Sequence, residues 1–129
     1  MIIFNCKNVK RIKQKYQKGI VNIKANYNNT LVTVCTIKGI IITWRSSGKC
    51  GFRGARKRTP FAANITAENA VKKCLEKGIR EVRIYVCGPG PGREIAIRGV
   101  FETGICVTNI RDISSVPHNG CRAQKKRRV

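Results

Sequence analysis

The stretch IVNIKANYNNTLVTVCTIKGIIITWR, residues 20–45, gives the strongest indication of the fold of this chain of 129 residues. Val21, Ile23 and Ala25 alternate with polar residues, and this period of two is typical of a β-strand with one buried face. A wholly disordered basic chain would lack such alternation. The pattern therefore predicts a folded domain whose first strand begins near Ile20.

The same stretch contains two turns that join three strands. Residues Tyr27–Thr30 are rich in asparagine, which tolerates positive φ and hydrogen-bonds its own backbone. They predict a turn into a strand at Leu31–Ile37. Lys38 and Gly39 predict a second tight turn, into a strand at Ile40–Arg45. We therefore expect three antiparallel strands.

Residues 46–58, SSGKCGFRGARKR, mix glycines with five cations and predict a basic loop without regular structure. Thr59 and Pro60 then predict the start of a helix, because a threonine hydroxyl caps free amides and proline already has helical φ. The helix is expected over Pro60–Lys77 and is ended by Gly78. Its predicted apolar stripe consists of Phe61, Ile65, Ala70, Cys74 and Leu75.

The C-terminal half predicts a strand, a helix and a last strand. Alternating apolar residues predict the strand at 82–87, and the sequence GPGPGRE at 88–94 predicts a turn. A helix is expected over Arg93–Glu102, although Gly99 weakens it by about 1 kcal/mol. A fifth strand is expected over Ile105–Arg111. The order β-β-β-α-β-α-β predicts a mixed α/β sheet in two or three layers, with helices as parallel crossovers.

The chain carries 27 Lys and Arg residues against 6 Asp and Glu residues, a formal net charge of +21. Such an excess destabilises an isolated compact domain through self-repulsion, whereas cations set against phosphates release condensed counterions and gain affinity. The charge balance therefore indicates a nucleic-acid partner. We expect a basic N-terminal arm at residues 1–18, a compact domain at 19–112 and a basic tail at 113–129.

Composition argues against several other classes of protein. No apolar stretch approaches the roughly twenty residues of a membrane-spanning helix, and the opening residues lack the features of a signal peptide. The 7 cysteines are widely spaced, without a Cys-x-x-Cys motif. We therefore expect free thiols that fill small apolar sites in a reducing compartment. We expect no metal and no cofactor.

Four motifs follow one another along the chain: NNT at 28–30, GFRGARKRTPFAA at 51–63, GPGPGRE at 88–94, and PHNGCR at 117–122 with KKRRV at the end. Together they resemble small ribosomal subunit protein eleven of bacteria and organelles, from about residue 18 onward. The resemblance implies a ribonuclease H-like fold used as a scaffold, without enzymatic activity. It also implies binding to small-subunit rRNA on the platform, near messenger RNA and beside ribosomal proteins seven, eighteen and possibly twenty-one.

The expected rRNA ligands come from four segments. The loop cations suit phosphates, the loop glycines allow close approach of RNA, and Phe52 suits stacking on a base. Packing of Phe52 beneath its own loop is the alternative. The predicted ligands are Asn28, Asn29, Lys49, Phe52, Arg53, Arg56, Lys57, Arg58, Arg93, His118, Asn119, Arg122, Lys125, Lys126, Arg127 and Arg128.

The turn before the second helix allows two interpretations. The sequence GPGPGR places backbone amides and a helix N-terminus beside Arg93, which suits a phosphate oxygen. A turn without a ligand fits as well, and the motif matches neither of the glycine patterns of nucleotide-binding loops.

The tail contains the one histidine of the chain, His118, three residues before Cys121. These two lack the further ligands that structural zinc requires, so RNA contact or a tight bend at Asn119-Gly120 is expected. The family usually has Pro-Pro between Arg122 and the basic end and a further proline after the last strand, whereas this chain has Ala123-Gln124 and Ser114-Ser115 there. Their absence leaves the path of the tail open.

Two other functions are weighed against the ribosomal one. A two-metal nuclease needs converging carboxylates, and the first three predicted strands contain none. A nucleic-acid chaperone outside the ribosome fits the charge, and only the ordered motifs argue against it. The stretch ITWRSSGKCGFRG at 42–54 resembles plastid members, so a plastid ribosome is expected, with a bacterial cytoplasm or a mitochondrion as alternatives.

Overall fold

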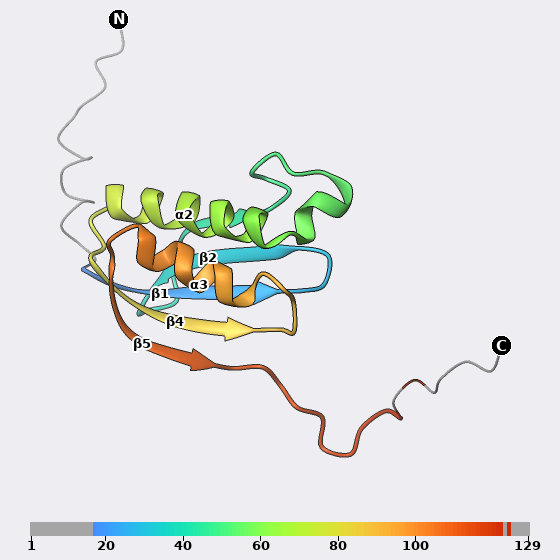
Figure 1. The fold of residues 1–129 in the computed structure, drawn as a ribbon. Coiled ribbons are helices and arrows are strands. Elements are labelled where there is room, and N and C mark those ends of the chain that lie inside the picture. Colours follow the sequence, from blue (N-terminus) through green and yellow to red (C-terminus); the bar gives the residue numbers. More distant parts are fainter. Residues whose placement is uncertain (1–16, 123, 125–129) are drawn as a thin grey trace, which may run out of the picture.

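The computed structural model describes residues 17–122 and 124 (Figure 1). In chain order the elements are β1 (Lys18–Ala25), β2 (Thr30–Thr36), β3 (Ile41–Ser46), the 3-10 helix η1 (Gly54–Arg58), α2 (Pro60–Glu76), β4 (Glu81–Cys87), α3 (Arg93–Glu102) and β5 (Cys106–Asp112). The succession of strands and α-helices is the predicted one. Of the predicted basic arm, residues 1–16 lie outside the described residues.

The five strands form one mixed sheet in the order β3-β2-β1-β4-β5. Tight turns make β1, β2 and β3 antiparallel neighbours, whereas α2 and α3 carry the chain back across the sheet, so that β4 runs parallel to β1 and β5 runs parallel to β4. Figure 1 shows both helices on the same face of the sheet. The described chain therefore has two layers, one of strands and one of helices. Of the two-layer and three-layer architectures that the sequence allowed, the structure has the first.

The core lies between the sheet and the two helices. The predicted alternation holds, because Val21, Ile23 and Ala25 are fully buried on the side of β1 that faces the helices. Val32 and Val34 of β2 extend the same apolar layer. On the opposite face β1 carries the polar residues Asn22 and Lys24, and no described helix covers that side of the sheet (Figure 1).

Helix α2 confirms the predicted stripe in part, since Ala70 and Cys74 are fully buried and Leu75 packs against the core. Its buried residues are Ala62, Ala63, Thr66, Ala67, Ala70, Val71 and Cys74. The prediction was wrong for Phe61, which is 66% exposed, and Ile65 is only half-buried. The reason is that the packed side of α2 consists of small residues, which give a weak apolar pattern but let the helix lie close to its neighbours.

Gly99 marks the closest approach between α2 and α3. A Cβ atom at this position would lie 2.3 Å from Asn64 Oδ1 and 3.2 Å from the Cβ atom of Ala67. Glycine weakens an isolated helix, but here it provides the room for the two helices to pack side by side. The prediction that α3 spans Arg93–Glu102 is confirmed despite this glycine.

Three smaller predictions need correction. The segment 46–58 is not wholly irregular, because it contains η1. Thr30 was placed in a turn, but it is buried at the start of β2 and pairs with Ala25. Ile37 and Ile40 were placed in strands, yet they lie exposed in the connection between β2 and β3.

Candidate nucleic-acid interface

The loop between β3 and α2 is held at its base by buried hydroxyl groups. Ser47 is fully buried, and the hydroxyl of Thr66 on α2 lies 3.3 Å from its Oγ atom. The amide of Phe52 donates to the Ser47 carbonyl at 3.2 Å. At the far end, Thr59 Oγ1 accepts from the amide of Ala62 at 3.3 Å, which confirms the predicted helix cap. The loop is therefore anchored at both ends.

The loop cations carry charge that the described residues do not neutralise. Helix η1 has no buried residue, and Arg53, Arg56 and Arg58 are all exposed. The ion pairs in the described part of the chain are Lys18–Glu81, Lys72–Glu68 and Arg93–Asp112. None of these pairs involves the loop. Its positive charge is thus available to a polyanion.

The turn between β1 and β2 lies against this loop. Asn28 lines an open hollow of about 300 Å³ together with Gly54, Ala55, Lys57 and Arg58. Residues up to thirty positions apart in the sequence thus line one concave, basic hollow. We call Asn28 and the loop segment 49–58 together the loop surface. The neighbouring Asn29 uses its side-chain oxygen within the turn, where it accepts from the Thr30 amide at 2.9 Å.

Phe52 contacts a second aromatic residue at the edge of the loop. Its ring lies edge-on to that of Phe61, with the centroids 6.1 Å apart and an interplanar angle of 87°. Phe52 is half-buried, whereas Phe61 is largely exposed. The pair therefore supports the packed position of Phe52 and also presents an aromatic surface beside the cations, so base stacking stays a prediction.

The side chain of Arg93 is engaged within the protein. It forms an ion pair with Asp112 and donates to the Gly88 carbonyl and to Ser114 Oγ, each at 3.4 Å. Ser114 Oγ in turn donates to Asp112 Oδ1 at 2.7 Å and accepts from the Gly88 amide at 3.1 Å. These contacts tie the segment after β5 to the turn before α3. A role of Arg93 in binding RNA stays a prediction.

The Arg93 guanidinium and the hydrogen bonds from Ser114 hold the pKa of Asp112 well below its ordinary value. The contribution of Asp112 to stability is therefore present above about pH 3.9, the ordinary aspartate pKa, and is lost as the pH falls through the pKa of Asp112 in the folded protein.

We expect Arg93→Gln to raise the pKa of Asp112 toward the ordinary value. A titration of the Asp112 carboxyl followed by NMR measures this shift. Arg98→Gln, on the same helix, is the matched control, and equal midpoints in both variants would contradict the assignment.

The predicted ligands of the tail lie beyond the opposite edge of the sheet. His118, Asn119 and Arg122 are exposed and follow β5, whereas the loop surface lies beside β3 and α2 (Figure 1). Asn119 has a φ of 50°, which confirms the expected bend before Gly120. Lys125, Lys126, Arg127 and Arg128 lie outside the described residues.

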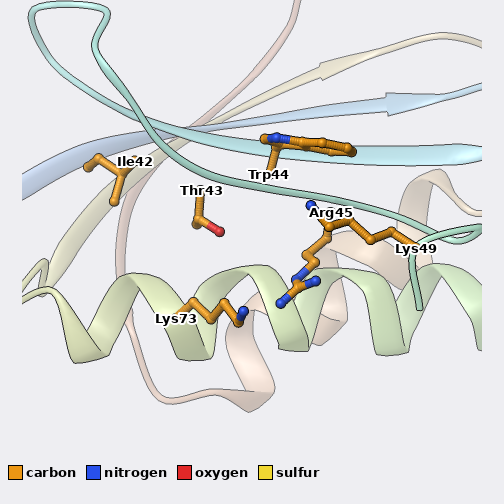
Figure 2. A pocket seen from close by; sticks show the side chains of 6 residues that line it. All are labelled: Ile42, Thr43, Trp44, Arg45, Lys49 and Lys73. Carbon is orange, nitrogen blue, oxygen red and sulfur yellow. The ribbon is translucent and has the colours of Figure 1, made fainter. Parts of the chain in front are cut away.

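Sequence reasoning missed a second basic hollow, which lies between β3 and α2. Figure 2 shows Arg45 and Lys73 pointing into the space between strand and helix, while Trp44 lies on the other side of the strand. The alternation of β3 contained a signal, since it places Arg45 in register with the buried Val32 and thus on the helix-covered face. The position of Lys73 could not be read from the sequence.

The cysteines fulfil their prediction only in part. The six cysteines among the described residues are free, and Cys35 and Cys74 are buried. Burial raises the pKa of the Cys74 thiol to about 11. The prediction was wrong for Cys106 and Cys121, which are exposed.

The described residues contain no group of three or more His, Cys, Asp or Glu side chains placed to hold a metal ion. None of the described helices is long and apolar enough to cross a membrane.

Several features of the chain are typical of a nucleic-acid-binding protein that acts as a scaffold. They are an α/β domain, an anchored loop whose cations form no ion pairs with the described residues, an adjoining hollow and a tail of basic sequence. A family model described as ribosomal protein S11 matches residues 19–128, and the chain belongs to this family. The match confirms the resemblance that the four motifs indicated. The protein is a structural constituent of the small ribosomal subunit and not an enzyme, and it associates with small-subunit rRNA and ribosomal proteins.

Curated relatives match along nearly the whole chain. The small ribosomal subunit protein uS11c of Nephroselmis olivacea is 52% identical over 93% of this chain and 92% of its own length. The protein of the same name from Pleurastrum terricola is 50% identical over 93% of both chains, and that from Marchantia polymorpha is 44% identical over 95% and 94%. Such relatives are chloroplast-encoded, and the protein is accordingly assigned to the plastid ribosome.

Proposed function

We propose that the loop surface is the principal rRNA contact of this protein. The observation that supports it is the hollow in which Asn28 meets Lys57 and Arg58, because it brings together two segments that the sequence predicted separately. Its cations lack partners among the described residues, and its glycines allow the backbone close to RNA. Cations of this kind bind phosphates, while asparagine can donate to a base edge or a sugar.

We propose different roles in rRNA binding for the other predicted ligands. Within the loop surface, Arg53 and Arg56 add exposed cations outside the hollow, and Lys49 lies at the start of the segment. Phe52, with Phe61, offers an aromatic edge to an unstacked base. Asn29 and Arg93 have side chains engaged within the protein, so any RNA contact by them would be shared with those bonds.

The tail forms the second part of the proposed interface. His118, Asn119 and Arg122 leave the domain at the β5 edge, and four cations follow at residues 125–128. Contacts on two sides of one domain would hold separate rRNA segments in a set arrangement. The proposed surroundings are the platform of the small subunit, near messenger RNA and beside ribosomal proteins seven, eighteen and possibly twenty-one.

Deleting residues 125–129 tests the proposed role of the tail. We expect weaker incorporation into small subunits and a salt slope of rRNA binding that is lower by about 3 to 4, because each lost phosphate contact lowers the slope by about one. Filter binding at several salt concentrations measures the slope, and co-sedimentation through a high-salt wash measures incorporation. A variant with Gln at residues 125–128 separates the loss of charge from the loss of length.

Two results would contradict the proposal. Incorporation of the truncated protein at the full level in raised salt would show that the tail cations do not bind RNA. Release of the intact protein from subunits by the wash would favour the alternative of a chaperone outside the ribosome.

A further inference from the structure

The hollow between β3 and α2 has a volume of about 280 Å³, and three of its lining residues are cations. Its walls consist of Ile42, Thr43, Trp44, Arg45, Lys49 and Lys73. In Figure 2 the guanidinium of Arg45 and the ammonium of Lys73 approach each other across the gap between strand and helix. This hollow is separate from the one lined by Asn28.

Backbone register places both cations there. Arg45 pairs with Val32, so its side chain leaves β3 on the face that α2 covers, whereas Trp44 pairs with Thr33 and leaves on the other face. On α2, Asn69 lies one turn before Lys73 and contacts Cys50 of the loop, while Lys77, which caps the end of the helix, lies one turn after it. Lys77 donates to the Ile42 carbonyl at 2.7 Å. The helix is thus in contact with the loop one turn before Lys73 and with β3 one turn after it, which fixes the position of Lys73 beside β3.

The charges of this hollow have no anionic partner among the described residues. Arg45, Lys49 and Lys73 form no ion pair with the described residues. The Nε atom of Arg45 is buried and has no hydrogen-bond partner among them. Lys49 instead lies over the Trp44 ring, with its Nζ 3.8 Å from the centroid. By contrast, the neighbouring Lys72 pairs with Glu68 at 2.8 Å.

Converging like charges and an unsatisfied buried N–H both cost free energy until an anion enters. A phosphate group meets both demands, since a guanidinium can donate through two N–H groups to its oxygens and an ammonium supplies a second charge. We propose that Arg45 and Lys73 form a binding site for one phosphate group. The inference rests on the proposed function in one respect, that the phosphate comes from the RNA backbone.

The double variant Arg45→Gln/Lys73→Gln tests the site in the full-length protein. We expect its affinity for a small-subunit rRNA fragment to fall about tenfold at 0.1 M salt and its salt slope to fall by about one, as for the loss of one phosphate contact. Lys38→Gln/Lys72→Gln removes the same charge at exposed positions on a turn and on the far side of α2, and is the matched control. A loss of affinity no greater than that of the control would overturn the inference.

A second measurement reads the site directly and does not depend on the variants. The Arg45 Nε–H resonance of the wild-type protein is followed by NMR during titration with the rRNA fragment and, separately, with inorganic phosphate at constant ionic strength. A shift with RNA alone supports a backbone phosphate, and a shift with both probes supports a general phosphate site. No shift with either overturns the inference. Wild-type protein that bound rRNA without salt dependence would instead contradict the proposed function itself.

Discussion

Replacing Arg53, Arg56 and Arg58 together by alanine is expected to weaken binding to small-subunit rRNA by about a hundredfold or more at 0.1 M salt. Each arginine set against a phosphate contributes up to about tenfold at this concentration through counterion release. The three side chains are exposed and lack partners among the described residues, so their removal leaves the fold intact. Filter binding over a range of salt concentrations should show a slope lower by about 2 to 3.

The matched control removes three exposed cations elsewhere, with Lys38, Lys72 and Arg80 replaced by alanine. This variant has the same net charge, so a difference between the two measures position and not total charge. Thermal melting of both free proteins should stay close to that of the wild type. A melting temperature that fell in step with the affinity would mean that the loop arginines support the fold, and the loop surface would then be structural.

The second large effect is expected on stability, from Gly90→Ala in the turn between β4 and α3. The amide of Gly90 donates to the Ala25 carbonyl at 2.9 Å, which draws the turn against the end of β1. A Cβ atom at Gly90 would lie 2.4 Å from the Asn26 carbonyl oxygen and 2.7 Å from the Ala25 carbonyl carbon. Both are backbone atoms, which cannot move without disturbing the sheet.

Overpacking against fixed backbone typically costs about 1 to 3 kcal/mol and occasionally more. We expect Gly90→Ala to reach the upper end of this range and to lower the melting temperature by roughly 10 °C. Gly48→Ala is the control, because the nearest atom to its Cβ would be the flexible Lys57 Cδ at 3.6 Å. Equal melting temperatures for the two variants would show that the turn moves away from β1 freely.

Local sequence patterns were enough to predict most elements. The alternation at residues 20–45 and 82–87 predicted four strands, because a strand with one buried face must repeat every two residues. Thr59 with Pro60 predicted the start of α2, since the cap and the ring act within one turn. The errors at Phe61 and Thr30 arose where a neighbour in space decided burial or strand pairing. Phe61, for example, contacts Phe52 and not the core.

Residue types and short spacings were sufficient to predict the basic character of the protein, its order of elements and its family. These properties depend on residue types and short spacings, which need no knowledge of distant contacts. Tertiary structure alone decided that Asn28 meets Lys57 and Arg58, that Asp112 pairs with Arg93, and that Arg45 converges with Lys73. Each of these contacts depends on strand register and on the packing of helices that are distant in sequence. For example, a shift of one residue in the register of β3 would turn Arg45 to the other face of the sheet.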